Sequence, residues 1–216
     1  MARKGTYRDR CGVARALDLV GERWALLVVR ELLLGPKRFT DLRAGLPHVS
    51  ADVLSQRLRE LEESGVVRRR TLAPPAAARV YELTERGREL EPVVLALGRW
   101  GSAAPFPPGD AELGVDAFVI ALKTLFDPTA AAGSAGHYEL RLGDQSFRAE
   151  LADGRLEVTR GAAQDPDAVI ESDPGTLSAV LWHDRELEEA ERSGAVKITG
   201  SRRAVTRFLR LFPLPA

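Results

Sequence analysis

Apolar and polar positions alternate at helical spacing through the first part of the chain. The apolar positions predict three helices, which carry Val13, Leu17 and Val20, then Trp24, Leu27, Val28 and Leu32, and then Phe39 and Leu42. Gly35 and Pro36 are expected to end the second helix. A fourth helix is predicted to begin after Ser50, because a serine hydroxyl can accept a hydrogen bond from a free amide of the first helical turn.

The pattern then changes from helical to strand-like. Residues 66–72 and 78–84 are rich in strand-forming residues, and residues 73–77 between them contain two prolines. We therefore expect an antiparallel strand pair joined by a stiff loop. Thr84 is expected to cap a further helix over residues 85–100. The predicted order is four helices, a strand, a loop, a strand and a helix. This order is typical of a winged helix-turn-helix domain.

Polar and apolar residues alternate strictly in the second half of the chain. After a predicted helix over residues 115–126, three strands are expected at 137–142, 146–151 and 155–160. Gly143-Asp144 and Asp153-Gly154 are typical hairpin turns between them. Because the apolar side chains of all three strands fall on one face, we expect that face to be buried.

The remaining pattern predicts a strand at 168–172, a helix from Pro174, a charged helix at 185–192, a strand at 195–199 and a last helix capped by Ser201. The predicted fold class is α+β, with a mostly antiparallel sheet covered by helices in the second half. Residues 101–110 have no periodicity and hold three prolines, so they are the expected linker. The expected domains are residues 1–104 and 111–216.

The predicted helix after Ser50 has one apolar and one polar face. Leu54, Leu58 and Leu61 share the inward side. The outward side can form hydrogen bonds with the edges of bases in a major groove, and the residues predicted to read them are Ser50, Ser55, Gln56 and Arg59. Glu60, Glu62 and Glu63 gather at the other end of the helix, which favours insertion of its N-terminal half.

Basic residues surround this helix in the sequence. Lys37 and Arg38 precede it, and we expect them to contact the phosphate backbone of a bound duplex. Arg68 and Arg70 share one face of the following strand and are candidates for the same role. Cross-strand ion pairs between these two arginines and Glu82 are the alternative interpretation.

The net charge of zero conceals two unequal halves. Residues 1–104 carry 19 Lys and Arg against 13 Asp and Glu, and residues 105–216 carry 12 against 18. The excess of positive charge in the first half indicates a polyanionic partner, such as double-stranded DNA, for that half alone.

Several other classes of protein are not indicated. The sequence has no apolar run long enough to span a bilayer and no signal-peptide core, so a cytoplasmic protein without membrane attachment is expected. One cysteine and three scattered histidines predict no metal site and no cofactor. Because no nucleophile, nucleotide-binding or dinucleotide-binding motif is present, we do not expect an enzyme.

Residues 8–101 closely resemble the HxlR family of bacterial winged-helix regulators, which is related to the MarR group. The motifs that carry the resemblance are Cys11 before the first helix, "GERW", "RFTDL", "LSQRLRELEESGVVR" and "YELTERGREL". The resemblance implies a transcriptional regulator that binds a pseudo-palindromic operator as a homodimer, pairing through its first and last winged-domain helices. The wing loop lacks the basic tip of many relatives, which leaves Arg79 as the nearest candidate for a wing contact with DNA.

Cys11 has two interpretations. In some members of the family, the cysteine at this position senses oxidants or electrophiles, which would require a thiolate activated by nearby cations such as Arg8, Arg10 or Arg15. A small buried apolar side chain is the alternative, since free cysteine is commonly buried.

From about residue 115 onward, the chain resembles the sterol-carrier-protein-2 fold. The resemblance implies an apolar tunnel for a lipid-like effector, whose binding would change DNA affinity. Candidate lining residues are Phe118, Leu122, Tyr138, Phe147, Leu181, Trp182, Phe208 and Phe212. Inward-facing residues of these types are also typical of an ordinary core. The alternative function is a hydrophobic-ligand carrier whose winged half serves only dimerisation.

Overall fold

The computed structural model describes residues 6–73, 77–104 and 113–215. Its internal contacts divide the chain into two units, Met1–Val94 and Leu95–Ala216, which we describe separately. The division falls earlier than the predicted boundary at residue 104, inside helix α6 (Glu91–Ser102). The first two residues of the predicted linker end this helix, and residues 105–110 of the linker lie outside the described residues.

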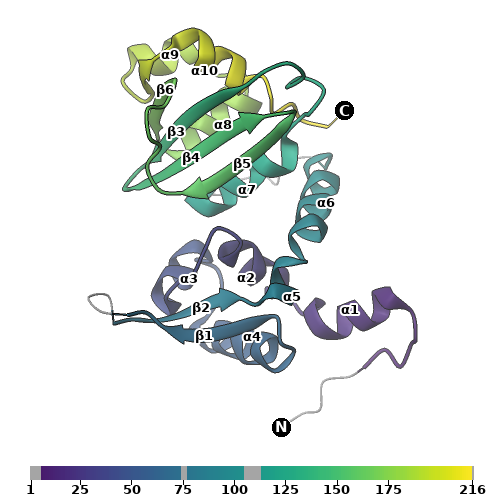
Figure 1. Ribbon diagram of the computed structural model, residues 1–216. Helices are drawn as coiled ribbons and strands as arrows, with labels where there is room; N and C mark the ends of the chain where they lie inside the picture. The colour runs from purple at the N-terminus through teal and green to yellow at the C-terminus, as the bar shows by residue number, and fades with distance from the viewer. Residues whose placement is uncertain (1–5, 74–76, 105–112, 216) are drawn as a thin grey trace. The chain divides into compact units, whose positions relative to one another are not determined.

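The first unit has the predicted order of elements (Figure 1). Its elements are α1 (Gly12–Val20), α2 (Ala25–Leu32), α3 (Phe39–Gly45), α4 (Ala51–Glu63), β1 (Val67–Thr71), β2 (Arg79–Leu83), α5 (Glu85–Arg88) and the start of α6. The two strands pair in antiparallel fashion, as expected. Lys37 adds an isolated bridge to Tyr81, whose amide donates a hydrogen bond of 2.8 Å to the Lys37 carbonyl.

Two sequence predictions about these helices are wrong. The single helix expected over residues 85–100 is two helices, because Pro92 has no N–H to donate to the Arg88 carbonyl in a continuous helix. Pro92 then occupies the first turn of α6, where its missing N–H costs little. Trp24 does not belong to α2 but precedes it as the N-cap, with a left-handed backbone.

The core of the first unit is formed mainly by α2, α4 and the two strands. Leu54, Leu58 and Leu61 of α4 are almost fully buried, as the sequence pattern predicted. They lie beside Val28 and Val29 of α2, since these two helices are in contact. Burial of such side chains stabilises a fold by about 1.5–3 kcal/mol each, so the inward face of α4 fixes the direction in which its outward face points.

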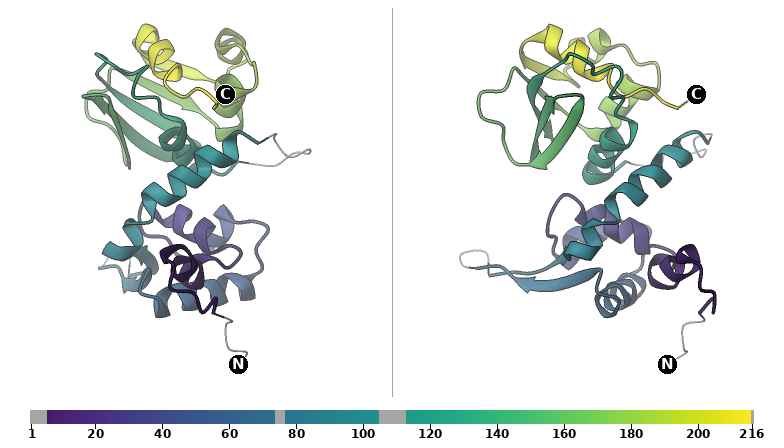
Figure 2. Two further views of the ribbon diagram at one scale, coloured as in Figure 1. Left: turned by 90° about the vertical axis from the view of Figure 1, so that its right-hand side faces the viewer. Right: turned by 45° about the vertical axis from the view of Figure 1, so that its right-hand side comes forward.

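The second unit is a five-stranded sheet with helices. Its elements are α7 (Val115–Leu125), β3 (Gly136–Leu142), β4 (Gln145–Ala152), β5 (Arg155–Arg160), β6 (Ala168–Ser172), α8 (Pro174–Trp182), α9 (Leu187–Arg192), β7 (Lys197–Gly200) and α10 (Arg202–Leu209). The strand order is β5-β4-β3-β6-β7, and only the β3–β6 pair is parallel among the described strands. Figures 1 and 2 show the helices of this unit gathered on one face of the sheet. The predicted α+β class is thus confirmed.

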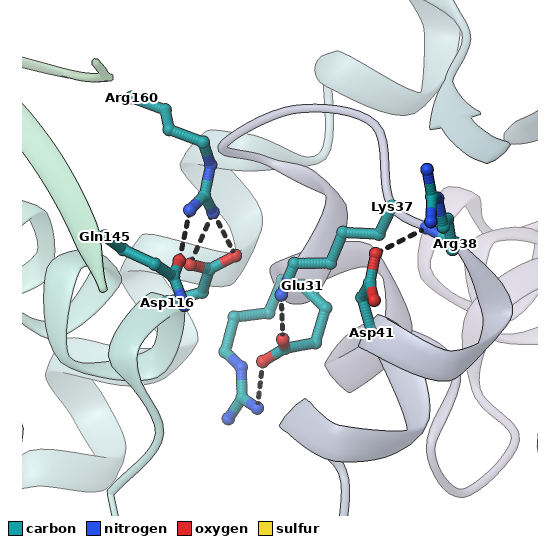
Figure 3. Close-up of polar contacts among 8 residues, drawn as sticks. Glu31, Lys37, Arg38, Asp41, Asp116, Gln145 and Arg160 are labelled. Atoms are coloured by element: carbon teal, nitrogen blue, oxygen red, sulfur yellow. Dashed lines mark hydrogen bonds and ion pairs between the residues drawn. The ribbon is translucent and has the colours of Figure 1, made fainter. Parts of the chain in front are cut away.

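An ion pair joins α7 to the edge strand β5. Asp116 is 3% exposed, and both of its carboxylate oxygens accept hydrogen bonds from Arg160, at 2.6 and 2.8 Å (Figure 3). The Arg160 guanidinium also contacts Gln145 and lies 4.8 Å from the centre of the Phe147 ring. One guanidinium nitrogen donates to both carboxylate oxygens, and this charge-assisted contact fastens the start of α7 to the sheet.

Candidate nucleic-acid interface

Helix α4 begins as the sequence predicted. The Ser50 hydroxyl accepts a hydrogen bond of 3.3 Å from the amide of Val53 and so caps the helix. Because this hydroxyl is exposed but already engaged with the backbone, Ser50 serves first to start the helix. Ser55 is half-buried, whereas Gln56 and Arg59 are exposed on the outward face.

The two outward side chains of α4 are held together. Arg59 donates a hydrogen bond of 2.7 Å to the Gln56 carbonyl oxygen, and the Gln56 amide nitrogen donates one of 2.8 Å to Glu60. Glu60 also pairs with Arg57, which reaches back to Glu22 at 3.5 Å. Gln56 and Arg59 therefore each donate to a side-chain partner on α4 that a base edge could replace.

A buried acid at the end of α2 binds a lysine of the turn before α3, and this pair was not predicted from the sequence. Glu31 of α2 is 2% exposed and accepts contacts from Lys37 at 2.5 Å and from Arg30 at 2.7 Å (Figure 3). Gly45 lies against this carboxylate, since an added Cβ would be 2.1 Å from Glu31 Oε2. The sequence signal was the charged pair Arg30-Glu31 inside the otherwise apolar run of residues 28–34.

This ion pair changes the interpretation of Lys37. Its side chain is only 14% exposed and its ammonium is bound to Glu31, so its first role is to neutralise a buried charge. Arg38, by contrast, is exposed, and its backbone amide donates to Asp41 at 3.1 Å (Figure 3). Within the described residues, the Arg38 guanidinium has no ion pair, which makes Arg38 the better candidate for a phosphate contact in this turn.

The three consecutive arginines of β1 all have acidic partners. Arg68 and Arg70 contact the two oxygens of Glu82 at 2.8 and 3.0 Å, and Glu82 is 5% exposed. Arg69 points the other way and donates bidentate hydrogen bonds to Glu62 of α4, which raise the pKa of its guanidinium. The cross-strand pairs that sequence analysis left open as an alternative are therefore present. Both Glu82-bound arginines remain half-exposed or more.

The wing, which is the strand pair β1 and β2 with its connecting loop, carries one further exposed cation. Arg79 begins β2, is exposed, and has no ion-pair partner among the residues that the structure describes. The predicted proline-containing loop lies partly at residues 74–76, outside the described residues. Arg38, Arg59 and Arg79 are thus exposed arginines without a carboxylate partner among the described residues of the candidate interface.

Cys11 is exposed and precedes α1 as its N-cap. Its amide donates a hydrogen bond of 2.8 Å to Asp9, and its side chain makes no cap hydrogen bond. The alternative that Cys11 is a small buried apolar residue is therefore wrong for the single chain. The thiol is accessible from solvent.

The residues predicted to line a ligand tunnel form much of the core of the second unit. Tyr138, Phe147, Phe118, Leu122, Phe208 and Phe212 are each at most 1% exposed, and Leu181 and Trp182 are half-buried. Several of them stack on one another, with ring centres 4.4 Å apart for Tyr138 and Phe208 and 5.8 Å apart for Phe118 and Trp182. Leu181 and Phe212 also line a hollow of about 580 Å³ beside α8, α9 and α10.

The described residues lack two features, a metal-binding cluster and a membrane-spanning helix. No group of three or more His, Cys, Asp or Glu residues is placed there to hold a metal ion. No helix in that part of the chain is both long and apolar enough to cross a membrane.

The second unit is similar to part of a known enzyme class. Residues 111–215 match the family described as the alkyl sulfatase C-terminal domain, where sequence analysis expected a sterol-carrier-protein-2 relative. A solved structure of a double mutant of the sec-alkyl sulfatase PisA1 is 22% identical, covers 48% of this chain and 17% of that chain, and has a TM-score of 0.44.

The first unit is similar to bacterial regulators. Residues 19–105 match the family described as HxlR-like helix-turn-helix. The HTH-type transcriptional regulator YvaP of Bacillus subtilis is 39% identical over 88 residues, which cover 41% of this chain and 82% of YvaP. The reduced form of the transcriptional regulator YodB from B. subtilis is 34% identical, covers 47% of this chain and 100% of that chain, and has a TM-score of 0.40. The chain belongs to the HxlR-like helix-turn-helix family of transcriptional regulators.

Proposed function

We propose that this protein regulates transcription by binding a pseudo-palindromic operator as a homodimer, with the N-terminal half of α4 in the major groove. The observation that carries the proposal is the outward face of α4, where Gln56 and Arg59 are exposed and joined side by side on a helix fixed by a leucine core. Glutamine and arginine can each make bidentate contacts with a purine. Ser50 and Ser55 are the short side chains that let the backbone approach.

Phosphate contacts would position this helix. Arg38 and Arg79 supply exposed cations. Arg68 and Arg70 can add two further phosphate contacts if a phosphate displaces the Glu82 carboxylate from their guanidinium groups. Lys37 contributes less, because Glu31 holds its charge. A protein that acts on the chromosome of a bacterium works in the cytoplasm, which agrees with the location predicted from the sequence.

The test is binding to the duplex that lies upstream of the protein's own gene, measured over a range of salt concentrations. Operator binding through several phosphate contacts predicts that the logarithm of the association constant falls linearly with the logarithm of salt concentration. No binding at low salt would favour the alternative function, a hydrophobic-ligand carrier whose first unit only dimerises.

The dimer would form through apolar side chains that the single chain leaves in solvent. Val93, Leu97 and Trp100 recur at i, i+4 and i+7 on α6 and are 50%, 48% and 78% exposed. Val13 and Leu17 of α1 are 68% and 40% exposed, although the sequence pattern placed them with the buried Val20. Exposed apolar faces of this kind are typical of interfaces between subunits.

Leu97→Glu is expected to convert the dimer to a monomer, because a carboxylate would be buried without a partner in the proposed interface. Sedimentation velocity measures the change. Ala152→Glu is the matched control, since Ala152 is exposed on β4, away from α6 in the sequence, and the added charge is the same. A dimer that persists in Leu97→Glu would contradict the proposed interface.

We further propose that the second unit binds a hydrophobic effector rather than catalysing a reaction. The hollow beside α8, α9 and α10 supports this, because Leu181, Leu187, Leu209 and Phe212 form an apolar part of its lining, next to charged side chains such as Glu188 and Arg210. A ligand can change operator affinity only if it binds two conformations of the protein with different affinity. The resemblance to sterol carrier protein 2 stays a prediction about this unit.

Native mass spectrometry of freshly purified protein is expected to show a dimer that carries a co-purified apolar ligand. Leu209→Glu should lose that ligand, because a charge would enter the hollow. Adding the identified ligand should change operator affinity of the wild type and leave that of Leu209→Glu unchanged. A bound ligand without any effect on operator affinity would contradict the coupling.

The exposed thiol of Cys11 supports the proposal of an oxidant response. Mild peroxide is expected to change operator affinity of the wild type and to leave Cys11→Ser unaffected. Mass spectrometry of the same samples reports the extent of oxidation. Quantitative oxidation of Cys11 with unchanged DNA binding would remove the sensor role.

A further inference from the structure

Helix α10 is a basic element in an otherwise acidic half of the chain. Residues 105–216 carry 18 acidic against 12 basic residues, yet residues 202–210 include four arginines and no acid. The inward side of α10 is Ala204, Val205 and Phe208, which are buried. The direction of its remaining side chains is thus fixed by the core.

Three of the four arginines share one stripe. Arg203, Arg207 and Arg210 follow one another at i, i+4 and i+7, which places them within roughly 60° of one another around the helix axis. Arg202 lies off this stripe and is bound by Glu188 at 2.7 Å and Glu191 at 2.9 Å. We call Arg203, Arg207 and Arg210 the α10 arginine stripe.

No carboxylate neutralises the α10 arginine stripe within the described part of the chain. Arg203 and Arg210 are exposed and have no hydrogen-bond or ion-pair partner there. Arg207 donates to the carbonyl of Ala135 at 3.1 Å and to the Tyr138 hydroxyl at 3.4 Å, which are both uncharged. The central guanidinium is therefore held in place while its charge remains available.

The spacing of these charges fits a polyanion better than a small anion. Seven residues of helix extend about 10 Å along its axis, and one DNA strand carries a phosphate about every 3.4 Å of duplex axis. The first unit of the same chain is the proposed operator-binding unit, so the chain itself tethers α10 to a duplex bound there.

We propose that the α10 arginine stripe contacts the phosphate backbone of DNA outside the operator, extending the footprint of the protein beyond the sequence that α4 reads. The proposal rests on the proposed operator binding. The contacts are blind to sequence, and their contribution to affinity depends on salt and on the length of the duplex.

The test compares two duplexes with full-length protein. The short duplex covers only the footprint of the minimal operator, and the long duplex adds about 10 base pairs, one helical turn, on each side. Fluorescence anisotropy gives the affinity for each over a range of salt concentrations. The variant Arg203→Ala/Arg210→Ala removes two exposed cations and leaves the anchored Arg207 in place.

Arg155→Ala/Arg192→Ala is the matched control. Both of its arginines are exposed in the same unit, so it carries the same change in net charge at positions off the stripe. Thermal unfolding of both variants should coincide with that of the wild type, since all four side chains are exposed.

We expect the stripe variant to bind the long duplex at least tenfold more weakly than the wild type. The slope of the logarithm of affinity against the logarithm of salt concentration should fall by about two per protomer, because each lost phosphate contact removes about 0.9. Binding to the short duplex should stay within twofold. Two results would overturn the proposal. One is a stripe variant that binds the long duplex as tightly as the control does, which is expected if α10 binds a protein partner instead. The other is an equal loss of affinity for both duplexes. If the wild type binds neither duplex, the proposed operator binding itself fails.

Discussion

Replacing Gln56 and Arg59 together by alanine is expected to lower operator affinity by about 100-fold or more, because each bidentate base contact contributes roughly 1–3 kcal/mol and a dimer uses both residues twice. Both side chains are exposed, and their recorded hydrogen bonds are to each other and to Glu60, also on the surface of α4. The free energy of unfolding should therefore change little. Anisotropy titrations of the operator duplex at fixed salt measure the loss.

The matched control is Gln164→Ala/Arg155→Ala, which removes the same two side-chain types from exposed positions of the second unit. The salt dependence of binding gives a second measurement. Loss of base contacts should abolish the preference for operator over unrelated DNA, while weak salt-dependent binding through phosphate contacts remains. Equal weakening on operator and unrelated DNA would show that α4 positions the protein without reading sequence.

Glu31→Ala is expected to lower the free energy of unfolding by about 3–5 kcal/mol, the usual cost of removing one member of a buried ion pair. Lys37 would keep a charge at 14% exposure without its 2.5 Å partner. Urea unfolding of the variant and of the wild type measures the difference. Glu63→Ala is the control, because Glu63 is an exposed acid on α4.

A second pair of variants separates the ion pair from the shape of the site. Glu31→Leu/Lys37→Met should lose less stability than Glu31→Ala, since it leaves only the partly exposed Arg30 without its carboxylate partner, whereas Glu31→Ala leaves both Arg30 and Lys37 without theirs. Gly45→Ala should destabilise the wild type more than the Glu31→Ala background, where the clash at 2.1 Å from Glu31 Oε2 no longer exists. A Glu31→Ala variant as stable as the Glu63→Ala control would contradict this account.

Periodicity was a good guide to the elements and a poor guide to their ends. Leu54, Leu58 and Leu61 marked the inward face of α4 correctly, and the three strands β3, β4 and β5 were found from alternation and turn residues. The break between α5 and α6 was missed, although Pro92 marks it in the sequence, because proline cannot donate the backbone hydrogen bond of a continuous helix.

Charged side chains were harder to interpret than apolar ones. A row of arginines at Arg68–Arg70 indicated phosphate contacts, but each is already paired with an acid from β2 or α4. The pairing of Lys37 was missed for the same reason, because Lys37 lies in the turn before α3 and its partner Glu31 lies in α2. Pairing across elements is set by the tertiary fold, which a local pattern does not contain. Val13 and Leu17 lie on the predicted helix but are exposed, because helical spacing does not show which apolar positions the core of a single chain covers.

The most direct test is selection of bound duplexes from a random-sequence pool by the full-length protein. If a homodimer reads DNA through α4, the recovered sequences will share two half-sites related by two-fold symmetry, with centres about one helical turn apart or a multiple of it. The same selection with Gln56→Ala/Arg59→Ala should enrich no sequence. Failure of the wild type to enrich any motif, or the same motif recovered by the variant, would contradict the account.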